Sequence, residues 1–356
     1  MRKVIIFDVL GSHCGMHYYD IAFADILREN GCTVEIASNF SEEEGSRPCL
    51  RQMFSCSKAC GIFRLAMAYW AFLSTVLKGS ADRIVYLAYG EIYELPFLAM
   101  SSFSSRVYVD VHEIHALKYK DDSNVSKLFE WVYKHLIHHV IYHSERTQKI
   151  LGDSKANMLY VPHFKYAFQK KYDYAKLQDD VKKCFLTGRT KFLFFGNLST
   201  VKGIDIVMDV FGRLEDYNDK FELVIAGQNV ENIDLSKIVR ENIAVVGRHI
   251  SDDELVYLYS KTDFVLLPYK KSSQSGIFAM AAYFRKPMIL SDIPYFRNML
   301  EEYPSFGICV NLKNYGNAIV SLLKKSKSDA YFVESDCNRF EEKKDINEFV
   351  INFIGK

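Results

Sequence analysis

Short apolar segments alternate with helical segments along most of this chain, and this alternation constrains the fold more than any other feature. Residues 4–10 form a largely apolar strand, residues 17–29 have the apolar spacing of a helix that stops before Gly31, and residues 33–38 supply the next strand. Apolar strands that alternate with helices are typical of a parallel sheet covered by helices on both faces. We therefore expect an α/β protein that opens as a doubly wound sheet.

The same alternation starts again at Lys191, where a buried strand (192–195), a glycine-containing loop (196–203) and an amphipathic helix (204–214) follow one another. Further strands are expected at residues 221–226, 243–246, 264–267, 288–290 and 307–310. A chain of 356 residues exceeds what one hydrophobic core usually serves, so two domains are expected. We place an N-terminal α/β domain at 1–165, a charged, Tyr-rich hinge at 166–190, a second α/β domain at 191–340 and a last segment at 341–356.

The last helical segment, residues 344–354, predicts a contact with the first domain. Its apolar residues Ile346, Phe349, Val350 and Phe353 follow the spacing i, i+3, i+4, i+7, which makes one apolar helix face that needs a partner. We expect this helix to return to the N-terminal domain.

Composition excludes several classes of protein. Forty-five Lys and Arg residues against 44 Asp and Glu leave a net charge of +1 without a long basic run, so a duplex nucleic-acid partner is not expected. The eight cysteines include no CxxC pair, which argues against a zinc framework or a disulfide scaffold. Without a signal-peptide pattern or a long uninterrupted apolar span, we expect a cytoplasmic protein that is soluble or peripheral to the inner face of the cell membrane.

One segment leaves two interpretations open. Residues 61–78 form the most apolar helix of the chain, interrupted only by Arg64. Such a helix can lie on a bilayer surface, but helices packed on a parallel sheet are equally apolar. Because a polar face enriched in Lys and Arg is missing, we favour the core interpretation and keep peripheral membrane contact as the alternative.

The stretch from residue 264 to residue 294 predicts an anion site. A strand is followed by a polar loop, a short apolar helix and another strand, so the loop residues Ser273, Gln274, Ser275 and Gly276 open a helix after a parallel strand. A helix N-terminus carries unpaired N–H groups and the positive end of the helix dipole, which favour a phosphate. Ser and Gly at this place are also ordinary helix caps, and that interpretation stays open.

Two features of the first domain lie at strand ends, where open α/β sheets bind ligands. The strand 106–111 runs into His112, and the first strand runs into a loop with Gly11 and Gly15. That loop lacks the GxGxxG pattern, and no carboxylate stands at a strand end about 20 residues later, so a dinucleotide-dependent enzyme is not supported.

These residues carry a resemblance. The segments VVGRHISDDELVYLYSKTDFVLLPY, FFGNLSTVKG and VIYHSERTQKIL followed by VPH resemble a GT-B glycosyltransferase of the GT4-like family, glycosyl transferases group 1. The resemblance implies a retaining enzyme that binds a nucleotide diphosphate sugar mainly through its C-terminal domain and the acceptor through its N-terminal one. It places the family's phosphate-binding lysine at Lys202, its catalytic histidine at His112 and its glycine loop at Gly11 to Gly15.

The sequence departs from the family pattern at three positions. Asn197 stands where the family usually has an arginine, and Ser272 and Met280 stand where it has two glutamates. A branch with Ser-Gln-Ser-Gly in place of the acidic motif resembles transferases of surface polysaccharide assembly, with a glycan or lipid-linked acceptor. Arg248, which follows a glycine at a neighbouring strand end, is the expected replacement cation.

The chemistry of sugar transfer needs few further groups. Departure of the donor's diphosphate builds negative charge, which the Lys202 ammonium and the backbone amides of Ser275, Gly276 and Ile277 can stabilise. His112 would position or polarise the acceptor hydroxyl, with His163 and His249 as secondary candidates. Since the chain lacks Asp-x-Asp, we expect no metal and no cofactor besides the sugar nucleotide as co-substrate. A catalytically inactive sugar-nucleotide-binding subunit and a GT-B-type epimerase or phosphorylase remain alternatives.

Overall fold

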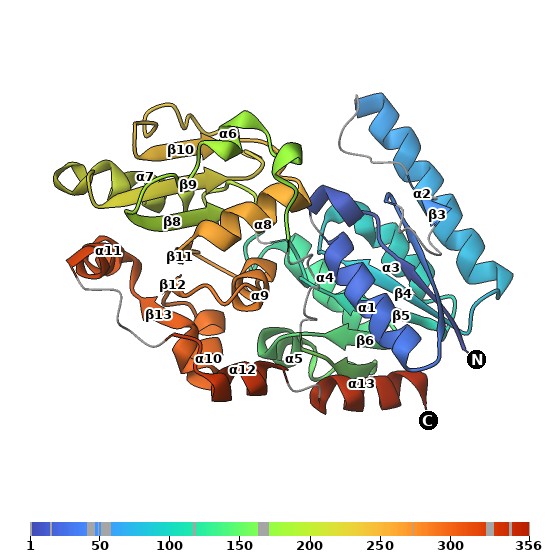
Figure 1. Ribbon diagram of the computed structural model, residues 1–356. Coiled ribbons are helices and arrows are strands. Elements are labelled where there is room, and N and C mark those ends of the chain that lie inside the picture. Colours follow the sequence, from blue (N-terminus) through green and yellow to red (C-terminus); the bar gives the residue numbers. More distant parts are fainter. Residues whose placement is uncertain are drawn as a thin grey trace. The chain divides into compact units, whose positions relative to one another are not determined.

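The computed structural model describes residues 2–14, 16–40, 47–48, 50, 58–116, 119–162, 171–272, 274–324, 331–341 and 344–355. The chain forms two compact units (Figure 1). Unit 1 comprises Met1–Tyr166 and Lys343–Lys356, and unit 2 comprises Ala167–Glu342. Each unit is an α/β structure around its own parallel sheet.

The sheet of unit 1 has the strand order β3-β2-β1-β4-β5-β6-β7, and all its paired strands are parallel. The strands are β1 (Lys3–Phe7), β2 (Thr33–Ser38), β3 (Arg47–Pro48), β4 (Arg83–Ala88), β5 (Val107–Val111), β6 (His139–Tyr142) and β7 (Asn157–Tyr160). The central strands are buried along nearly their whole length, because helices cover both faces of the sheet.

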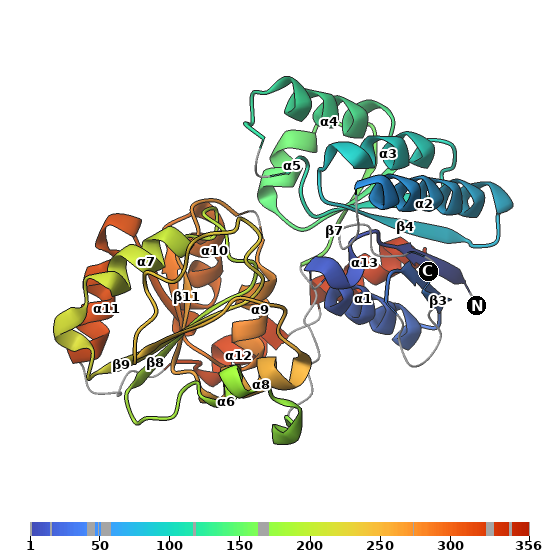
Figure 2. The ribbon, with the colours of Figure 1, turned by 90° about the horizontal axis from the view of Figure 1, so that it is seen from above.

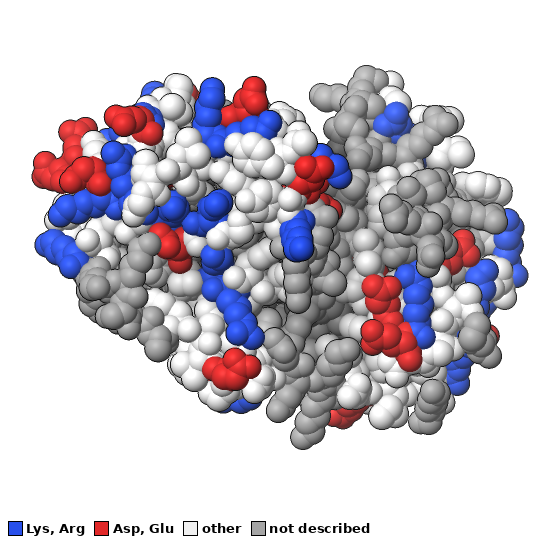
Figure 3. Space-filling model, viewed as in Figure 1, with Lys and Arg blue, Asp and Glu red and all other residues white. Residues whose placement is uncertain are grey.

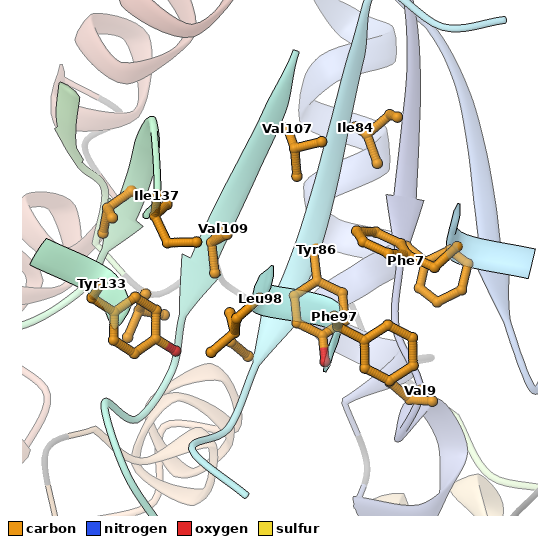
Figure 4. Packing of buried hydrophobic residues seen from close by; sticks show 14 of the residues in the cluster. Phe7, Val9, Ile84, Tyr86, Phe97, Leu98, Val107, Val109, Tyr133 and Ile137 are labelled. Carbon is orange, nitrogen blue, oxygen red and sulfur yellow. The ribbon is translucent and has the colours of Figure 1, made fainter. Parts of the chain in front are cut away.

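The helices of unit 1 form two layers. They are α1 (His17–Glu29), α2 (Lys58–Lys78), α3 (Leu95–Ser101), α4 (Asn124–His135), α5 (Glu145–Leu151) and α13 (Lys344–Ile354), with 3₁₀ turns at Gly11–Cys14 and Ile92–Glu94. Figure 2 shows α2, α3 and α4 on one side of the sheet and α1 and α13 on the other. Between α2, α3 and the sheet lies an aromatic core, in which Phe7, Phe97 and Tyr86 pack together (Figure 4).

Helix α13 packs within unit 1. Its four apolar residues Ile346, Phe349, Val350 and Phe353 are buried. The ring of Phe349 lies 5.8 Å from the ring of Phe23 in α1, and the ring of Phe353 lies 4.9 Å from that of Tyr108 in β5. The face that the apolar spacing singled out is therefore the face that covers the sheet of unit 1.

Helix α2 differs from the expected core helix. One face is buried in unit 1 through Ala68, Phe72 and Val76, but the opposite face exposes large apolar side chains such as Phe63 and Trp70 to solvent. Among the described residues, its segment Ala59–Lys78 is the one helix long and apolar enough to cross a membrane. The core interpretation of residues 61–78 therefore holds for one face only, because a helix that is apolar all round can bury only one side against a sheet.

The sheet of unit 2 has the order β10-β9-β8-β11-β12-β13 and is also parallel throughout. Its strands are β8 (Thr190–Phe195), β9 (Phe221–Ala226), β10 (Ile243–Val246), β11 (Phe264–Leu267), β12 (Met288–Ser291) and β13 (Gly307–Val310). Its helices are α6 (Asp179–Lys182), α7 (Ile204–Gly212), α8 (Asp252–Lys261), α9 (Gly276–Tyr283), α10 (Pro294–Glu302), α11 (Tyr315–Lys324) and α12 (Glu334–Glu341), with 3₁₀ turns at Tyr174–Lys176, Glu215–Tyr217, Pro304–Phe306 and Leu312–Asn314.

The predicted hinge at 166–190 differs from what the structure describes for residues 171–190. Val181, Cys184 and Phe185 are buried in unit 2, and the Tyr257 hydroxyl of α8 donates a hydrogen bond to the Cys184 carbonyl at 3.0 Å. The polar, Tyr-rich composition suggested a linker, but its few apolar residues anchor the segment to α8. Residues 163–170 lie outside the described residues.

Candidate active site

The carboxyl ends of β5 and β6 bring an acidic and two imidazole side chains together in unit 1. Asp110 lies near the end of β5, His112 follows β5, and His143 follows β6. The parallel register pairs Val111 with Tyr142, so the next residues, His112 and His143, leave the sheet side by side. Their ring centroids are 5.0 Å apart, and both residues are buried.

Asp110 is the centre of this cluster. The Tyr19 hydroxyl of α1 donates a hydrogen bond to Asp110 Oδ2 at 2.6 Å, and His143 Nε2 lies 2.6 Å from Asp110 Oδ1. Burial by itself raises the pKa of Asp110, but the charges of His143 and His112 and the hydrogen bonds from His143 and Tyr19 outweigh burial. The pKa of Asp110 therefore lies below its ordinary value, and the carboxylate is ionised.

His143 is held at both ring nitrogens. Nδ1 lies 2.9 Å from the carbonyl oxygen of Val161, and Nε2 faces the Asp110 carboxylate. A carbonyl and an ionised carboxylate can only accept hydrogen bonds. These two contacts hold the His143 ring in one orientation beside Asp110.

His112 is the predicted catalytic histidine, and three neighbours fix its ring. The ring stacks on Tyr89 with centroids 5.3 Å apart, meets Tyr19 edge-on at 4.6 Å, and places Nε2 3.9 Å from Asp110 Oδ2. Only 4% of the residue is exposed. The structure therefore places His112 at a strand end, as expected, but packed among aromatic and charged partners.

The first loop is organised by Asp8, which sequence reasoning missed. Asp8 Oδ2 accepts the Gly11 N–H at 2.6 Å, and Oδ1 accepts the Leu10 N–H at 2.9 Å and the Tyr89 hydroxyl at 3.0 Å. Burial raises the pKa of Asp8 despite these hydrogen bonds. The amide of Gly11, in the predicted glycine loop, is thus engaged inside the loop, and Gly15 lies outside the described residues.

Four unit 1 residues join this site without having been predicted: Asp8, Tyr19, Tyr89 and His143. Asp8 had a usable signal, because it is the one charged residue in the apolar run 4–10. His143 also ends an apolar run, but its pairing with Asp110 depends on the order of β5 and β6 in the sheet. The aromatic residues had no local signal.

In unit 2 the predicted phosphate lysine lies beside the first turn of α9. A side-chain carbon built on Gly196 would lie 3.4 Å from Lys202 Nζ and 3.2 Å from Ile277 Cδ1. These three residues, from the end of β8, the following loop and α9, therefore meet at one place. Lys202 Nζ also lies 5.6 Å from the centre of the Tyr269 ring, which follows β11.

Two glycines allow this approach. Gly196 has φ +108° and Gly203 has φ +80°, a region that side-chain-bearing residues rarely adopt. A Cβ at Gly203 would lie 2.0 Å from the Pro268 carbonyl oxygen, so no other residue fits there. The loop can therefore run close to the end of β11 and present Lys202 immediately before α7.

Helix α9 begins where the anion site was predicted. Ser275 is the N-cap, with extended backbone, and its hydroxyl accepts the Phe278 N–H at 3.2 Å. The capping interpretation thus holds for the Ser275 side chain. Gly276 and Ile277 are the first helical residues, whose N–H groups lack partners within a helix. The backbone carbonyl of Gln274 accepts a hydrogen bond from the Ser272 hydroxyl at 2.5 Å.

Five further positions named from the sequence are Ser273, His163, Asn197, His249 and Met280. Ser273 lies outside the described residues, and so does His163. Asn197 is half-buried in the loop after β8, and His249 is exposed. Met280, at a position where the family has a glutamate, is buried in α9 and supplies no polar group.

Arg248 does not fit the predicted role of replacement cation. Its guanidinium bonds Asp180 through Nε at 3.1 Å and one terminal nitrogen at 2.6 Å, Glu254 through both terminal nitrogens at 2.9 and 2.7 Å, and the His249 carbonyl at 2.9 Å. A guanidinium has five N–H donors, so these contacts use them all. The glycine before Arg248 suggested a ligand site, but two carboxylates from other elements bind the side chain.

Electrostatics agree with a structural role for this arginine. The hydrogen bonds that Arg248 donates to Glu254 and to Asp180 raise the pKa of Arg248 above its ordinary value. Burial by itself raises the pKa of Glu254, but Arg248 and backbone donors outweigh burial and lower it to about 2. The pair anchors α6 to the capping box that starts α8.

Comparison with known proteins agrees with this architecture. The family model for glycosyl transferases group 1 matches residues 189–325, which lie in unit 2. Sucrose-phosphate synthase from Thermosynechococcus elongatus is similar over 99% of this chain and 97% of its own, with 15% identity and a TM-score of 0.71. A search of curated protein sequences gives no match.

Two further solved structures have the same fold. HepE from Anabaena, in complex with UDP-glucose, covers 100% of this chain and 99% of its own with 12% identity and a TM-score of 0.71. WaaG, a glycosyltransferase involved in lipopolysaccharide biosynthesis, covers 98% and 99% with 12% identity and a TM-score of 0.67. The predicted GT-B fold is confirmed, and residues 189–325 of unit 2 match the glycosyl transferases group 1 family.

Proposed function

We propose that this protein is a retaining glycosyltransferase that moves a sugar from a nucleotide diphosphate donor to a glycan or lipid-linked acceptor in surface polysaccharide assembly. The observation that carries the proposal is the meeting of Gly196, Lys202 and the first turn of α9 in the domain that matches the family. HepE, which shares the fold, binds UDP-glucose, and this supports a sugar nucleotide as the donor.

The unit 2 site suits a diphosphate that gains charge as it leaves. Among the described residues, no carboxylate forms an ion pair with Lys202, whereas the neighbouring Lys270 is paired with Asp205 at 2.6 Å. The Lys202 ammonium can therefore act on a ligand. Together with the N–H groups of Gly276 and Ile277, it offers donors that need no reorganisation when negative charge develops.

The unit 1 site suits the acceptor. The Asp110 carboxylate is paired with His143 within the protein. The neighbouring His112 ring is held in place by Tyr19 and Tyr89. His112 would polarise or position the hydroxyl that attacks the donor sugar. Since Ser272 and Met280 supply no carboxylate nucleophile, we propose that leaving-group departure and attack occur on one face of the sugar through an oxocarbenium-like state.

We propose that neither metal nor cofactor takes part besides the sugar nucleotide. We also propose that the protein works in the cytoplasm at the inner face of the cell membrane.

Basic and acidic side chains are interspersed over the face of unit 2 in Figure 3, in keeping with a near-neutral chain and a local anion site. Nucleic acid is not among the proposed partners.

The test combines binding with turnover. Thermal unfolding is followed with ADP, GDP, UDP, CDP or dTDP, and we expect one base to raise the melting temperature, because a ligand of the native state stabilises it by mass action. The matching sugar nucleotides are then incubated with and without candidate acceptors. Release of nucleoside diphosphate that depends on the acceptor supports transfer.

Two other outcomes would contradict the proposal. If no nucleoside diphosphate shifts the melting temperature, unit 2 does not bind the proposed donor. If nucleotide binds but the sugar is only epimerised, or is transferred to orthophosphate, the enzyme belongs to a different reaction class.

A further inference from the structure

The outward face of helix α2 is an apolar surface of unit 1. Five large side chains on this helix are between 54% and 71% exposed: Ile62, Phe63, Met67, Trp70 and Leu77. With 3.6 residues per turn, these positions all fall on one side of the helix. In Figure 1, α2 is the long blue helix along one border of unit 1.

The opposite face fixes α2 to unit 1. The Phe72 ring lies 4.9 Å from the ring of Phe7 and 5.5 Å from that of Phe97. At the end of the helix, Arg106 donates hydrogen bonds to the carbonyls of Val76 at 2.8 Å and Ala81 at 2.9 Å. Crossing a bilayer would remove these contacts, so the helix can lie on an apolar surface but cannot span one without opening the core.

The charges of α2 favour an anionic partner. The helix contains Lys58, Arg64 and Lys78 and no Asp or Glu. Trp70 stands near the middle of the apolar face, and tryptophan is enriched where apolar and polar surroundings meet at a membrane surface. A helix that combines an apolar face with basic residues binds anionic lipid by burying the apolar face at the level of the headgroups.

We propose that the outward face of α2 docks unit 1 onto an anionic lipid bilayer, with Ile62, Phe63, Met67, Trp70 and Leu77 in contact with lipid. The choice of lipid rests in part on the proposed function, because a lipid-linked acceptor is held at a membrane. A second copy of the chain or another protein on this face would be a different answer, and the experiment separates them.

The two tryptophans of the chain, Trp70 and Trp131, allow a direct test. Trp131→Phe leaves Trp70 as the single reporter, and Trp70→Phe leaves Trp131, which is 51% exposed on α4. Vesicles of phosphatidylcholine with phosphatidylglycerol should shift the emission of Trp70 to shorter wavelength and leave that of Trp131 unchanged. Equal responses of the two tryptophans, or no response of Trp70, would overturn the proposal.

A matched pair of substitutions tests the energetics. Phe63→Asp removes an apolar contact and adds a negative charge of the same sign as the lipid headgroups. The affinity for the same vesicles, measured by co-sedimentation, should therefore weaken roughly tenfold or more. Ile351→Asp, at a side chain that is 52% exposed on α13, should bind as wild type does. Equal binding by both variants would overturn the proposal.

Two controls keep the outcomes distinct. Sedimentation velocity without lipid should give a monomer for wild type and for Phe63→Asp; a dimer that Phe63→Asp abolishes would assign the face to a second copy instead. The nucleoside diphosphate thermal shift should be the same in all variants. If vesicle binding fails while the thermal shift persists, the docking proposal is wrong and the proposed function stands. If the vesicles bind but no nucleoside diphosphate shifts the melting temperature, the docking proposal stands and the proposed function is wrong.

Discussion

The strand-end sites of the two units differ in how their charges are compensated. In unit 1, Asp110 and His143 form a buried ion pair, and Tyr19 completes the hydrogen bonding of the carboxylate. In unit 2, the Lys202 ammonium lies near Gly196 and the N-terminus of α9, and no carboxylate among the described residues forms an ion pair with it. One site is electrically complete without ligand, whereas the other retains a positive charge.

This difference shows what each site can bind. Charged groups that are paired inside the protein gain little from a charged ligand, but they hold neighbouring rings in fixed positions. An ammonium and helix amides that lack internal partners gain most from an anion. We therefore propose that unit 1 positions a neutral acceptor group and that unit 2 binds phosphate, so substitutions in the two units should have different effects.

His112→Ala should have the largest effect on activity. Loss of a positioned general acid or base lowers the turnover number by about 10²–10⁴-fold. Nucleoside diphosphate affinity should stay unchanged, since His112 belongs to unit 1. The control is His135→Ala, an exposed histidine on α4. If His112→Ala turns over at the wild-type rate, the assignment of His112 as a catalytic residue is wrong.

Asp110→Asn should have the largest effect on stability. It replaces the buried carboxylate that faces His143 and Tyr19 by a neutral amide, and breaking one side of a buried pair destabilises by about 3–5 kcal/mol. Urea unfolding followed by far-ultraviolet circular dichroism measures this. Asp153→Asn is the control, because its pair with Lys134 at 2.8 Å is at the surface and should matter little.

The same carboxylate predicts a pH dependence. Since the folded-state pKa of Asp110 is below its ordinary value, its contribution to stability is present at pH values above the ordinary carboxyl pKa. That contribution is lost as the pH falls through the lowered value. The acid limb of the stability profile should therefore be steeper in wild type than in Asp110→Asn, and parallel limbs would contradict the ion pair.

The sequence predicted features that depend on local pattern. Alternating strands and helices predicted both sheets, and the spacing in residues 344–354 identified the buried face of α13. Each of these requires only the periodicity of one segment or the rule that parallel strands end at one edge.

Features set by distant partners could not be predicted in this way. Arg248 lies after a glycine at a strand end, but Asp180 and Glu254 from two helices bind it. The apolar helix α2 was assigned to the core, because its composition cannot reveal how many of its sides are covered. The pairing of Asp110 with His143 and Tyr19 depends on strand order and on the position of α1.

Lys202→Ala should weaken nucleoside diphosphate binding by roughly 10- to 100-fold, because a hydrogen bond to a charged group contributes about 1.5–3 kcal/mol. Turnover should fall as well. Lys270→Ala is a matched control, since Lys270 is a nearby lysine whose charge is already paired with Asp205. Isothermal titration calorimetry gives both affinities. Equal losses in the two variants would mean that general positive charge, and not the Lys202 position, matters.

Gly276→Pro tests the helix amides of unit 2. Gly276 is the first residue of α9, where proline is tolerated, and Ser275 has the extended backbone that a following proline requires. The helix should therefore persist, while loss of one N–H donor should lower nucleoside diphosphate affinity roughly tenfold. Gly276→Ala keeps the N–H group and is the control. A folded proline variant with wild-type affinity would make this helix start a cap only.

The smallest expected effect is that of chelation, and it tests the contrast between the sites most directly. Among the described residues, Asp110, His112 and His143 form the one cluster whose ligand atoms, all within 4.8 Å of one another, could hold a metal ion. His143 Nε2 and Asp110 Oδ1 are 2.6 Å apart, which is a hydrogen-bond distance, and Tyr19 donates to the other carboxylate oxygen. A metal ion would have to compete with both contacts. We therefore expect the transfer rate to be unchanged after EDTA treatment and buffer exchange, and unchanged again on addition of Mg²⁺, Mn²⁺ or Zn²⁺.

The opposite result would be loss of wild-type activity in EDTA and its recovery with a divalent ion, together with an altered ion dependence in Asp110→Asn. It would mean that Asp110, His112 and His143 bind a metal ion and that the unit 1 site is not complete without a ligand.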